Sequence, residues 1–314
     1  MVMDTLGDVY VGLGEYRSAQ QLLDRAIGLP YPEEGDRLTR VKILVDQGEL
    51  MRLQARYPES EDSFRRAIRS LATRSEPDAK LLDAEAHFGL GKVLAAQGDY
   101  VASADAYHQS LAVQEVIFAD PSPVVGRTLI ALGDVLRNQR QYEEAIRVLD
   151  RALSIGRNLW PDQLHPDIAD ALGVRGAVLY DSGQVAASVP EFQEALRINR
   201  RVRGDSHPEV GQTLENIANS YADLGETGNA RKAFEESLRV RTVALGPDHP
   251  DVGGTAYDLA TLVADANDFP AAIRYGRRAL DIYRHAYPRE HPDIALVLNM
   301  LGYWELREIG RAHV

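Results

Sequence analysis

The chain has 314 residues, with 45% hydrophobic and 26% charged residues and no cysteine, so disulfides, thiolate catalysis and cysteine-based zinc sites are excluded. The formal net charge is −12, which disfavours broad binding to nucleic acid or to an anionic membrane. No apolar run approaches the ~20 residues of a membrane-spanning helix, and the lack of cysteine favours a reducing, cytoplasmic compartment.

A repeat of about 42 residues runs along the chain. The dipeptide His-Pro recurs with a spacing of 42 at His165, His207, His249 and His291. A small residue recurs at spacings of 41 to 43, at Gly7, Gly48, Gly91, Gly133, Gly176, Ala218, Ala260 and Gly302. Two further small residues follow each of the first seven after 12 and 19 positions. Small residues allow two helices to cross closely, so each repeat predicts a helical hairpin.

In chain order, the predicted repeats span about 1–35, 36–77, 78–121, 122–164, 165–206, 207–248 and 249–290, with a half repeat at 291–307. Large residues lie sixteen positions after the small residue of the first helix, at Phe64, Tyr107, Leu149, Phe192 and Phe234. The turns between paired helices are expected at Gly14, Gly98, Gly183, Gly225 and Asn267.

Three repeats depart from the pattern. Repeat 2 has Ala55-Arg56-Tyr57-Pro58 where a glycine turn is expected, which leaves its turn geometry open. Repeat 5 has Arg175 at an apolar position, and Pro190 predicts a late start or a kink in its second helix. Repeat 8 has no predicted second helix, so apolar surface around Leu298 and Leu301 is expected to be exposed and to favour self-association.

The last seven residues form a segment of different character. Residues 308–314 read Glu-Ile-Gly-Arg-Ala-His-Val, which one frame of a common sequencing-adapter oligonucleotide would encode. We expect this segment to be a non-native tail and leave it out of the fold prediction.

The repeat resembles the tetratricopeptide repeat (TPR) family. A 42-residue unit with the linker Gly246-Pro247-Asp248-His249-Pro250-Asp251 resembles the variant found in kinesin light chains and in many bacterial proteins. The resemblance implies an all-α fold, a right-handed superhelical solenoid of antiparallel helix-turn-helix hairpins with about seven and a half repeats. It also implies that the first helices line a concave groove.

Two motifs suggest chemistry, but each has a simpler structural interpretation. The four histidines lie in different repeats, too far apart to share one metal ion, so we expect them to begin helices. Gly89-Leu90-Gly91-Lys92 lacks the other residues of a phosphate-binding loop. No set of nucleophile, base and acid recurs, so the chain is not expected to be an enzyme or to hold a cofactor or metal.

The groove implied by the resemblance gives the candidate binding residues. They are Arg127, Asp134, Arg137, Asn138, Asp170, Tyr180, Asp181, Gln212, Glu215, Asn219, Asp223, Tyr257, Asp265, Asn299 and Tyr303. Amide side chains can pair with a ligand backbone, and tyrosine combines apolar area with a polar tip. The excess of aspartate over arginine in repeats 5 to 7 favours a basic protein or peptide.

The sequence therefore predicts a protein-protein interaction scaffold that binds a peptide or protein segment in this groove. An alternative is a sensor or regulatory arm of a larger bacterial signalling protein, such as a serine/threonine kinase or a nucleotide-switch regulator. A third interpretation, an enzyme, has only the abundant acidic residues in its favour.

Overall fold

The computed structural model describes residues 21, 23, 25, 36–118 and 121–312, and in this part of the chain it is all-α without a strand. The predicted first repeat, with Gly7 and Gly14, lies almost wholly outside the described residues. The chain divides into two compact units, Met1–Leu159 (unit 1) and Trp160–Val314 (unit 2). None of the described helices is both long and apolar enough to cross a membrane.

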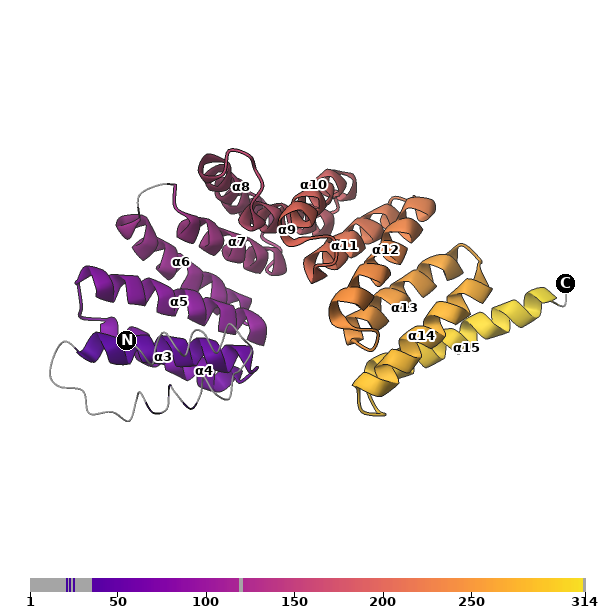
Figure 1. Ribbon diagram of the computed structural model, residues 1–314, viewed down its shortest axis with the longest axis horizontal. Helices are drawn as coiled ribbons and strands as arrows, with labels where there is room; N and C mark the ends of the chain where they lie inside the picture. The colour runs from indigo at the N-terminus through magenta and orange to yellow at the C-terminus, as the bar shows by residue number, and fades with distance from the viewer. Residues whose placement is uncertain (1–20, 22, 24, 26–35, 119–120, 313–314) are drawn as a thin grey trace. The chain divides into compact units, whose positions relative to one another are not determined.

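Unit 1 contains three helical hairpins among its described residues, in which each helix packs against the next along the chain (Figure 1). The helices are α3 (Asp36–Leu53), α4 (Tyr57–Leu71), α5 (Pro77–Gln97), α6 (Tyr100–Ile117), α7 (Pro123–Asn138) and α8 (Tyr142–Leu159). In each hairpin the first helix of the predicted repeat pairs with the second, so the predicted hairpin arrangement is confirmed for these helices.

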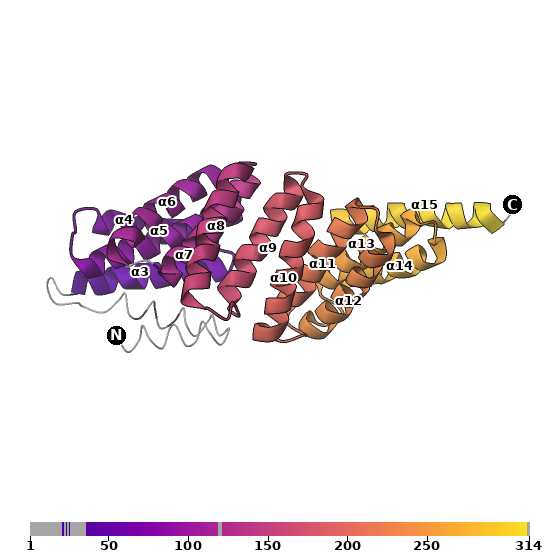
Figure 2. The same ribbon diagram turned by 90° about the horizontal axis from the view of Figure 1, so that it is seen from above.

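Unit 2 has the same arrangement with an additional helix after the third hairpin (Figure 2). Its helices are α9 (Pro166–Asp181), α10 (Val185–Arg203), α11 (Pro208–Asp223), α12 (Thr227–Leu245), α13 (Pro250–Asp265), α14 (Phe269–Ala286) and α15 (Pro292–Ala312). The additional helix, α15, packs on α14 and continues through the first five residues of the predicted tail.

Close helix crossing explains the recurring glycines. A Cβ atom on Gly176 of α9 would lie 2.7 Å from Cε1 of Phe192 on α10, closer than carbon atoms can approach. The same conflict would arise between three other predicted glycines and the large residue sixteen positions later, namely Gly48 with Phe64, Gly91 with Tyr107 and Gly133 with Leu149. The predicted small-against-large pairs are therefore confirmed at these crossings.

The turns between paired helices adopt the left-handed backbone conformation, and glycine does not always provide it. Gly98, Gly183 and Gly225 have φ between 75° and 82°. In repeat 2, Ala55 has φ 57°, which settles the turn geometry that the sequence left open, and Arg140 has φ 61° in repeat 4. Non-glycine residues pay roughly 1–2 kcal/mol for this conformation.

The recurring histidines cap the first helices of unit 2. His207 Nδ1 accepts a hydrogen bond from the backbone N–H of Glu209 at 3.2 Å, directly before the proline that begins α11. His165, His249 and His291 make the same bond to Asp167, Asp251 and Asp293. This bond satisfies one of the free N–H groups at a helix N-terminus, so the predicted role at helix starts is confirmed.

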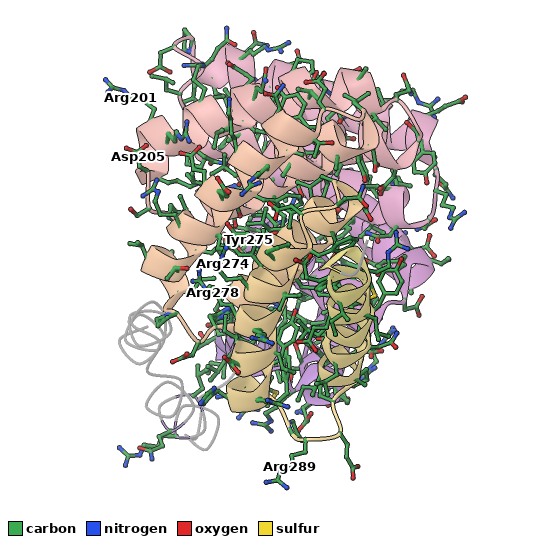
Figure 3. All side chains as sticks on the ribbon, turned by 90° about the vertical axis from the view of Figure 1, so that its right-hand side faces the viewer. Arg201, Asp205, Arg274, Tyr275, Arg278 and Arg289 are labelled. Atoms are coloured by element: carbon green, nitrogen blue, oxygen red, sulfur yellow. The ribbon has the colours of Figure 1, made fainter. Side chains whose placement is uncertain are left out.

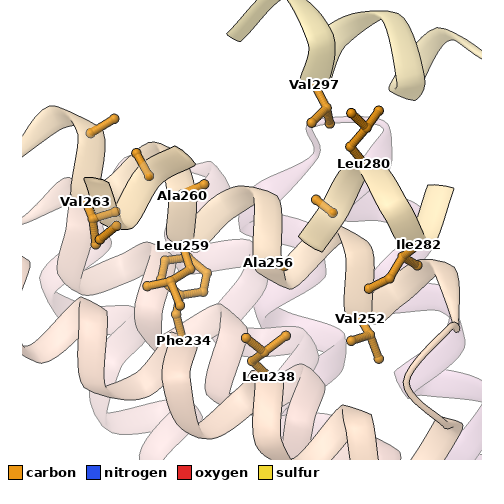
Figure 4. Close-up of a cluster of buried hydrophobic side chains, with 14 of the residues drawn as sticks. Phe234, Leu238, Val252, Ala256, Leu259, Ala260, Val263, Leu280, Ile282 and Val297 are labelled. Atoms are coloured by element: carbon orange, nitrogen blue, oxygen red, sulfur yellow. The ribbon is translucent and has the colours of Figure 1, made fainter. Parts of the chain in front are cut away.

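The largest core cluster of unit 2 contains buried residues of every helix from α10 to α15, and Figure 4 shows part of it. A Cβ on Gly276 of α14 would lie 2.7 Å from the ring of Trp304, so this glycine leaves the space in which Trp304 of α15 packs. Leu301 also packs there and is buried, so the prediction that Leu301 would be exposed is wrong. Leu298 is 44% exposed, as predicted.

Helix α10 begins earlier than predicted. Pro190 lies inside the helix, which starts at Val185, so the predicted late start is wrong. Pro190 is the sixth residue of the helix, beyond the N-terminal N–H groups that have no intrahelical acceptor, so the helix lacks the one bond that an N–H at this position would donate to the carbonyl of Ala186. Arg175, the other departure in repeat 5, donates to both carboxylate oxygens of Glu191 on α10 at 2.8 Å.

Candidate interaction surface

The predicted binding residues of unit 1 interact mainly along their own helix, α7. Arg137 pairs with Asp134 at 3.0 Å, and the amide of Asn138 donates to the backbone carbonyl of Asp134 at 2.9 Å. Arg127 is exposed and donates to the carbonyl of Pro123. A ligand on α7 would therefore have to compete with these contacts.

In unit 2, two predicted residues join neighbouring first helices. The hydroxyl of Tyr180 at the end of α9 donates to Asp223 at the end of α11 at 2.6 Å. Burial and this hydrogen bond raise the pKa of Tyr180 to about 12. Asp170, one turn into α9, instead pairs with Arg203 of α10 at 2.7 Å. Asp181 is exposed at the end of α9.

Two further predicted residues are held by Arg241, a buried residue of α12. Its Nη2 donates to Gln212 Oε1 at 2.6 Å, and its Nη1 donates to Glu215 and to the hydroxyl of Thr255 on α13. The hydroxyl of Thr255 donates to the same Glu215 oxygen at 2.6 Å. Gly211 leaves room for the stem of Arg241, since a Cβ there would lie 2.6 Å from its Cγ. This network, the Arg241 cluster, joins α11, α12 and α13.

The remaining predicted residues differ in their exposure and in their contacts. Asn219 and Asp265 make no side-chain hydrogen bond or ion pair with any described residue, and Asp265 is exposed. Tyr257 is half-buried against the core of unit 2. Asn299 and Tyr303 are exposed on α15, where the guanidinium of Arg307 lies 6.0 Å from the centre of the Tyr303 ring.

Asp258 of α13 is an additional carboxylate, close enough to the Arg241 cluster to interact with the charges of Glu215 and Arg241. Its side chain is partly buried and has no ion pair or hydrogen bond to a described residue. Burial and the nearby charge of Glu215 raise the pKa of Asp258 to about 6, against the opposing effect of Arg241. At neutral pH the negative charge of Asp258 therefore lowers the free energy of unfolding.

We expect Asp258→Asn to stabilise the protein at neutral pH and to leave its stability unchanged near pH 4. Because the folded-state pKa lies above the ordinary value of 3.8, the folded state loses stability as the pH rises from about 4 to about 6. The variant should escape this loss and gain about 1–2 kcal/mol at pH 7, after allowance for partial exposure. Urea unfolding at several pH values measures this gain. Asp265→Asn is the control, and an equal gain at both pH values would contradict the assignment.

Charge is separated between the two kinds of helix in unit 2. The first helices α9, α11 and α13 carry nine acidic residues and one basic residue, Arg175. The second helices α10, α12 and α14 carry twelve basic and five acidic residues. Arg201, Arg274 and Arg278 are three of these arginines (Figure 3). We call the residues of α9, α11 and α13 that are not buried the first-helix face, and this face is acidic.

The residues that the structure describes form no recognisable set of side chains for binding a metal ion or a phosphate. No group of three or more histidine, aspartate or glutamate side chains among them is placed to hold a metal ion. Gly89 and Gly91 lie within α5, where they face Phe64 and Tyr107, and Lys92 pairs with Glu49 at 2.8 Å. This segment is therefore part of the packing between repeats.

Sequence reasoning missed Arg241 and Asp258. Arg241 lies twenty-three positions after Ala218, where the other repeats have uncharged residues such as Asn199 and Tyr283. A single charged residue at an otherwise uncharged, buried position was the signal that could have found it. Asp258 is adjacent to the predicted Tyr257 and gave no separate signal.

Comparison with models of protein families matches the tetratricopeptide repeat over residues 82–158, 167–242 and 209–285, which is more than half of the chain. A second model with the same description matches residues 130–202. A comparison with curated protein sequences finds no match.

Several solved structures share the fold at low sequence identity. A Rap protein complexed with Competence and Sporulation Factor is 10% identical, with a TM-score of 0.63 over 90% of this chain and 76% of that chain. BtubC from P. vanneervenii is 18% identical, with a TM-score of 0.60 over 83% and 95%. A signal transduction ATPase with a tetratricopeptide repeat sensor from Pyrococcus horikoshii is 15% identical, with a TM-score of 0.72 over 95% and 43%.

Proposed function

The chain belongs to the tetratricopeptide repeat family, and from this premise we propose that it is a protein-interaction scaffold whose first-helix face in unit 2 binds a basic segment of another protein. The observation that carries the proposal is the separation of charge, with nine acidic residues and one basic residue on α9, α11 and α13. Complementary charge increases the association rate and the selectivity for a basic partner. The lack of cysteine supports a reducing compartment such as the cytoplasm.

Different residues contribute differently to this face. Asp258 and Asp265 supply carboxylates without an internal partner, and Asn219 supplies a free amide that can pair with the backbone of a bound segment. Tyr257 supplies apolar area beside them. Glu215 and Gln212 accept hydrogen bonds from Arg241, so we expect them to contribute less to binding than the carboxylates without an internal partner.

Binding of a fluorescein-labelled peptide of alternating lysine and glycine tests the proposal. We expect saturable binding that weakens with added salt, and no binding of the same peptide with glutamine in place of lysine. Replacing Asn219 and Tyr257 together by alanine should weaken binding by about tenfold or more, a change of about 1.4 kcal/mol, and circular dichroism melting checks that the protein stays folded without the half-buried Tyr257 ring.

A charge-matched pair of variants controls for net charge. The double variant Asp258→Asn/Asp265→Asn removes two carboxylates from the first-helix face and should weaken binding of the lysine peptide. The double variant Asp205→Asn/Asp281→Asn removes two carboxylates that lie after α10 and on α14 and should leave binding unchanged. Equal effects of the two double variants would overturn the assignment of the binding face.

A second candidate is a sensor or regulatory arm within a larger signalling protein. The likeness in fold to the ATPase with a tetratricopeptide repeat sensor favours it, because that match covers 95% of this chain and 43% of that one. A kinase or nucleotide-binding motif in the same reading frame as this chain would support this candidate. If the complete gene encodes no such motif, the interaction scaffold remains as the proposed function.

A further inference from the structure

An ion pair between consecutive second helices recurs at equivalent positions of the repeats. In unit 1, Arg151 of α8 pairs with Glu115 of α6. In unit 2, Arg200 of α10 pairs with Glu236 of α12 at 2.6 Å. In both pairs the two residues lie 36 positions apart in the sequence. Side chains at this spacing therefore meet where neighbouring repeats pack together.

The corresponding pair between α12 and α14 contains an arginine but no carboxylate. Arg278 of α14 lies 36 positions after Thr242 of α12, and its Nη2 donates to the hydroxyl of Thr242 at 3.0 Å. That hydroxyl donates in turn to the backbone carbonyl of Leu238. Arg278 is half-buried and forms no ion pair with any residue that the structure describes. Charged side chains that are partly removed from water are usually paired, so Arg278 lacks the kind of partner that its position has in the other two interfaces.

A second arginine of α14 lies beside Arg278. Arg274 is four positions earlier, so both side chains are on the same side of the helix (Figure 3). Its guanidinium lies 5.0 Å from the centre of the Tyr275 ring, and it is exposed and has no ion pair within the described part of the chain. A ring contact can hold a guanidinium without neutralising its charge. Two guanidinium groups without an ion pair are therefore about 6 Å apart along α14.

Both arginines line a pocket of about 590 Å³ on unit 2. The linker before α13 forms another part of the wall with Pro247 and Asp248, and Ile273 of α14 adds apolar surface. We call this pocket the Arg278 pocket.

A related pocket lies on α10, two repeats earlier. Its residues Leu164, Gln193, Arg197 and Arg201 lie 84 positions before Asp248, Arg277, Asp281 and His285 of the Arg278 pocket. The pocket on α10 is present although the hairpin of α11 and α12 follows it. A pocket at this position is therefore a feature of the repeat.

Two carboxylates of the Arg278 pocket restrict the anions that it can bind. Asp248 and Asp281 line it together with the arginines, and the whole chain has a formal net charge of −12. Both would repel a long polyanion such as nucleic acid. A short acidic segment can avoid Asp281 and place its own carboxylates on Arg274 and Arg278. Alternate residues of an extended chain lie on the same side about 6.6 Å apart, close to the spacing of the two arginines.

We propose that the Arg278 pocket binds an extended acidic segment of a partner protein, with carboxylates at alternate positions on Arg274 and Arg278. A guanidinium can donate two parallel hydrogen bonds to one carboxylate. Arg278 donates to Thr242 with only one of its five N–H groups, so the others are available for this purpose. The pocket is on a second helix, so this site is separate from the first-helix face and its basic ligand.

Binding of a fluorescein-labelled peptide of alternating glutamate and glycine tests the proposal. We expect saturable binding at about 0.1 M salt, where the repulsion of distant charges is screened, and no binding of the same peptide with glutamine in place of glutamate. Arg278→Gln should weaken binding by about tenfold or more. Arg201→Gln removes the same charge from an exposed position of α10 and should leave binding unchanged. Lack of saturable binding, or equal effects of the two variants, would overturn the proposal.

A carboxylate supplied by the chain itself provides a second test. Thr242→Glu should pair with Arg278 as Glu236 pairs with Arg200, so it should weaken binding of the glutamate peptide without lowering the melting temperature. Val243→Glu adds the same charge at the next residue, which is 63% exposed and points about 100° further round α12, and it should have little effect. Equal weakening by both variants would show an effect of net charge alone and reject the pocket as the site. Binding of the lysine peptide to the first-helix face should be the same in both variants, so the two proposals are tested separately.

Discussion

Replacing Gly176 by leucine is expected to lower the free energy of unfolding by about 1–3 kcal/mol or more. Gly176 faces Phe192 at the crossing of α9 and α10, where a Cβ would lie 2.7 Å from Cε1 and 2.8 Å from Cδ1 of the ring. Both positions are buried, so neither the introduced leucine nor the Phe192 ring can move into solvent. The leucine must force the two helices apart, and urea unfolding monitored by circular dichroism measures the loss.

Two further variants separate overpacking from a change in helix propensity. Gly173 lies three residues earlier on the same helix, and a Cβ there would meet no atom within 4 Å. Gly173→Ala should therefore be neutral or stabilising by about 0.5–1 kcal/mol. In a Phe192→Ala background the space for a leucine exists, so Gly176→Leu should cost less than it does in the wild-type protein. Equal costs in both backgrounds would contradict the proposed contact.

Close crossings explain why the hairpins could be predicted from the sequence. Where the two helices of a hairpin cross closely, a small residue contacts a large residue sixteen positions later. Such pairs recur in the sequence, as Gly91 and Tyr107 do, and they can be recognised there. The pattern does not extend to Ala260, because the residue sixteen positions later is Gly276, and the large side chain that packs against Gly276 is Trp304 of the next helix. The sequence repeat does not indicate that a residue of the next helix packs at this glycine, and only the contacts in the structure show it.

The turns were harder to predict than the helices, because residues other than glycine also adopt the left-handed conformation that a turn requires. A glycine indicates the left-handed conformation, as at Gly183, but Arg140 and Ala55 adopt it without any such indication. Their unfavourable backbone conformation costs little compared with the packing of the two helices that they join.

The candidate surface could be predicted only in part, because the family resemblance placed exposed positions of the first helices but gave no information about the second helices. It identified Asn219 and Asp265, which have no internal partner, together with Gln212 and Glu215, which Arg241 occupies. Which carboxylates remain free depends on arginines of the second helices, and a pattern confined to the first helices cannot show this.

Arg241→Met is expected to cost about 3–5 kcal/mol, because it breaks a buried ion pair and leaves its partners behind. Methionine preserves the apolar stem that packs on Gly211 but removes the guanidinium. Glu215 would then keep a largely buried charge with only the hydroxyl of Thr255 beside it, and Gln212 would lose its donor. Arg241→Lys should recover little of this loss, because one ammonium cannot reach Gln212, Glu215 and Thr255 as the planar guanidinium does.

The double variant Arg241→Met/Glu215→Met distinguishes the broken ion pair from a simple loss of packing. With both charges removed, the site contains apolar groups of similar length, and most of the lost stability should return. The two single variants and the double variant form a cycle whose coupling free energy urea unfolding can measure. If the double variant is as unstable as Arg241→Met alone, then the packing of the arginine stem, and not its charge, holds α11, α12 and α13 together.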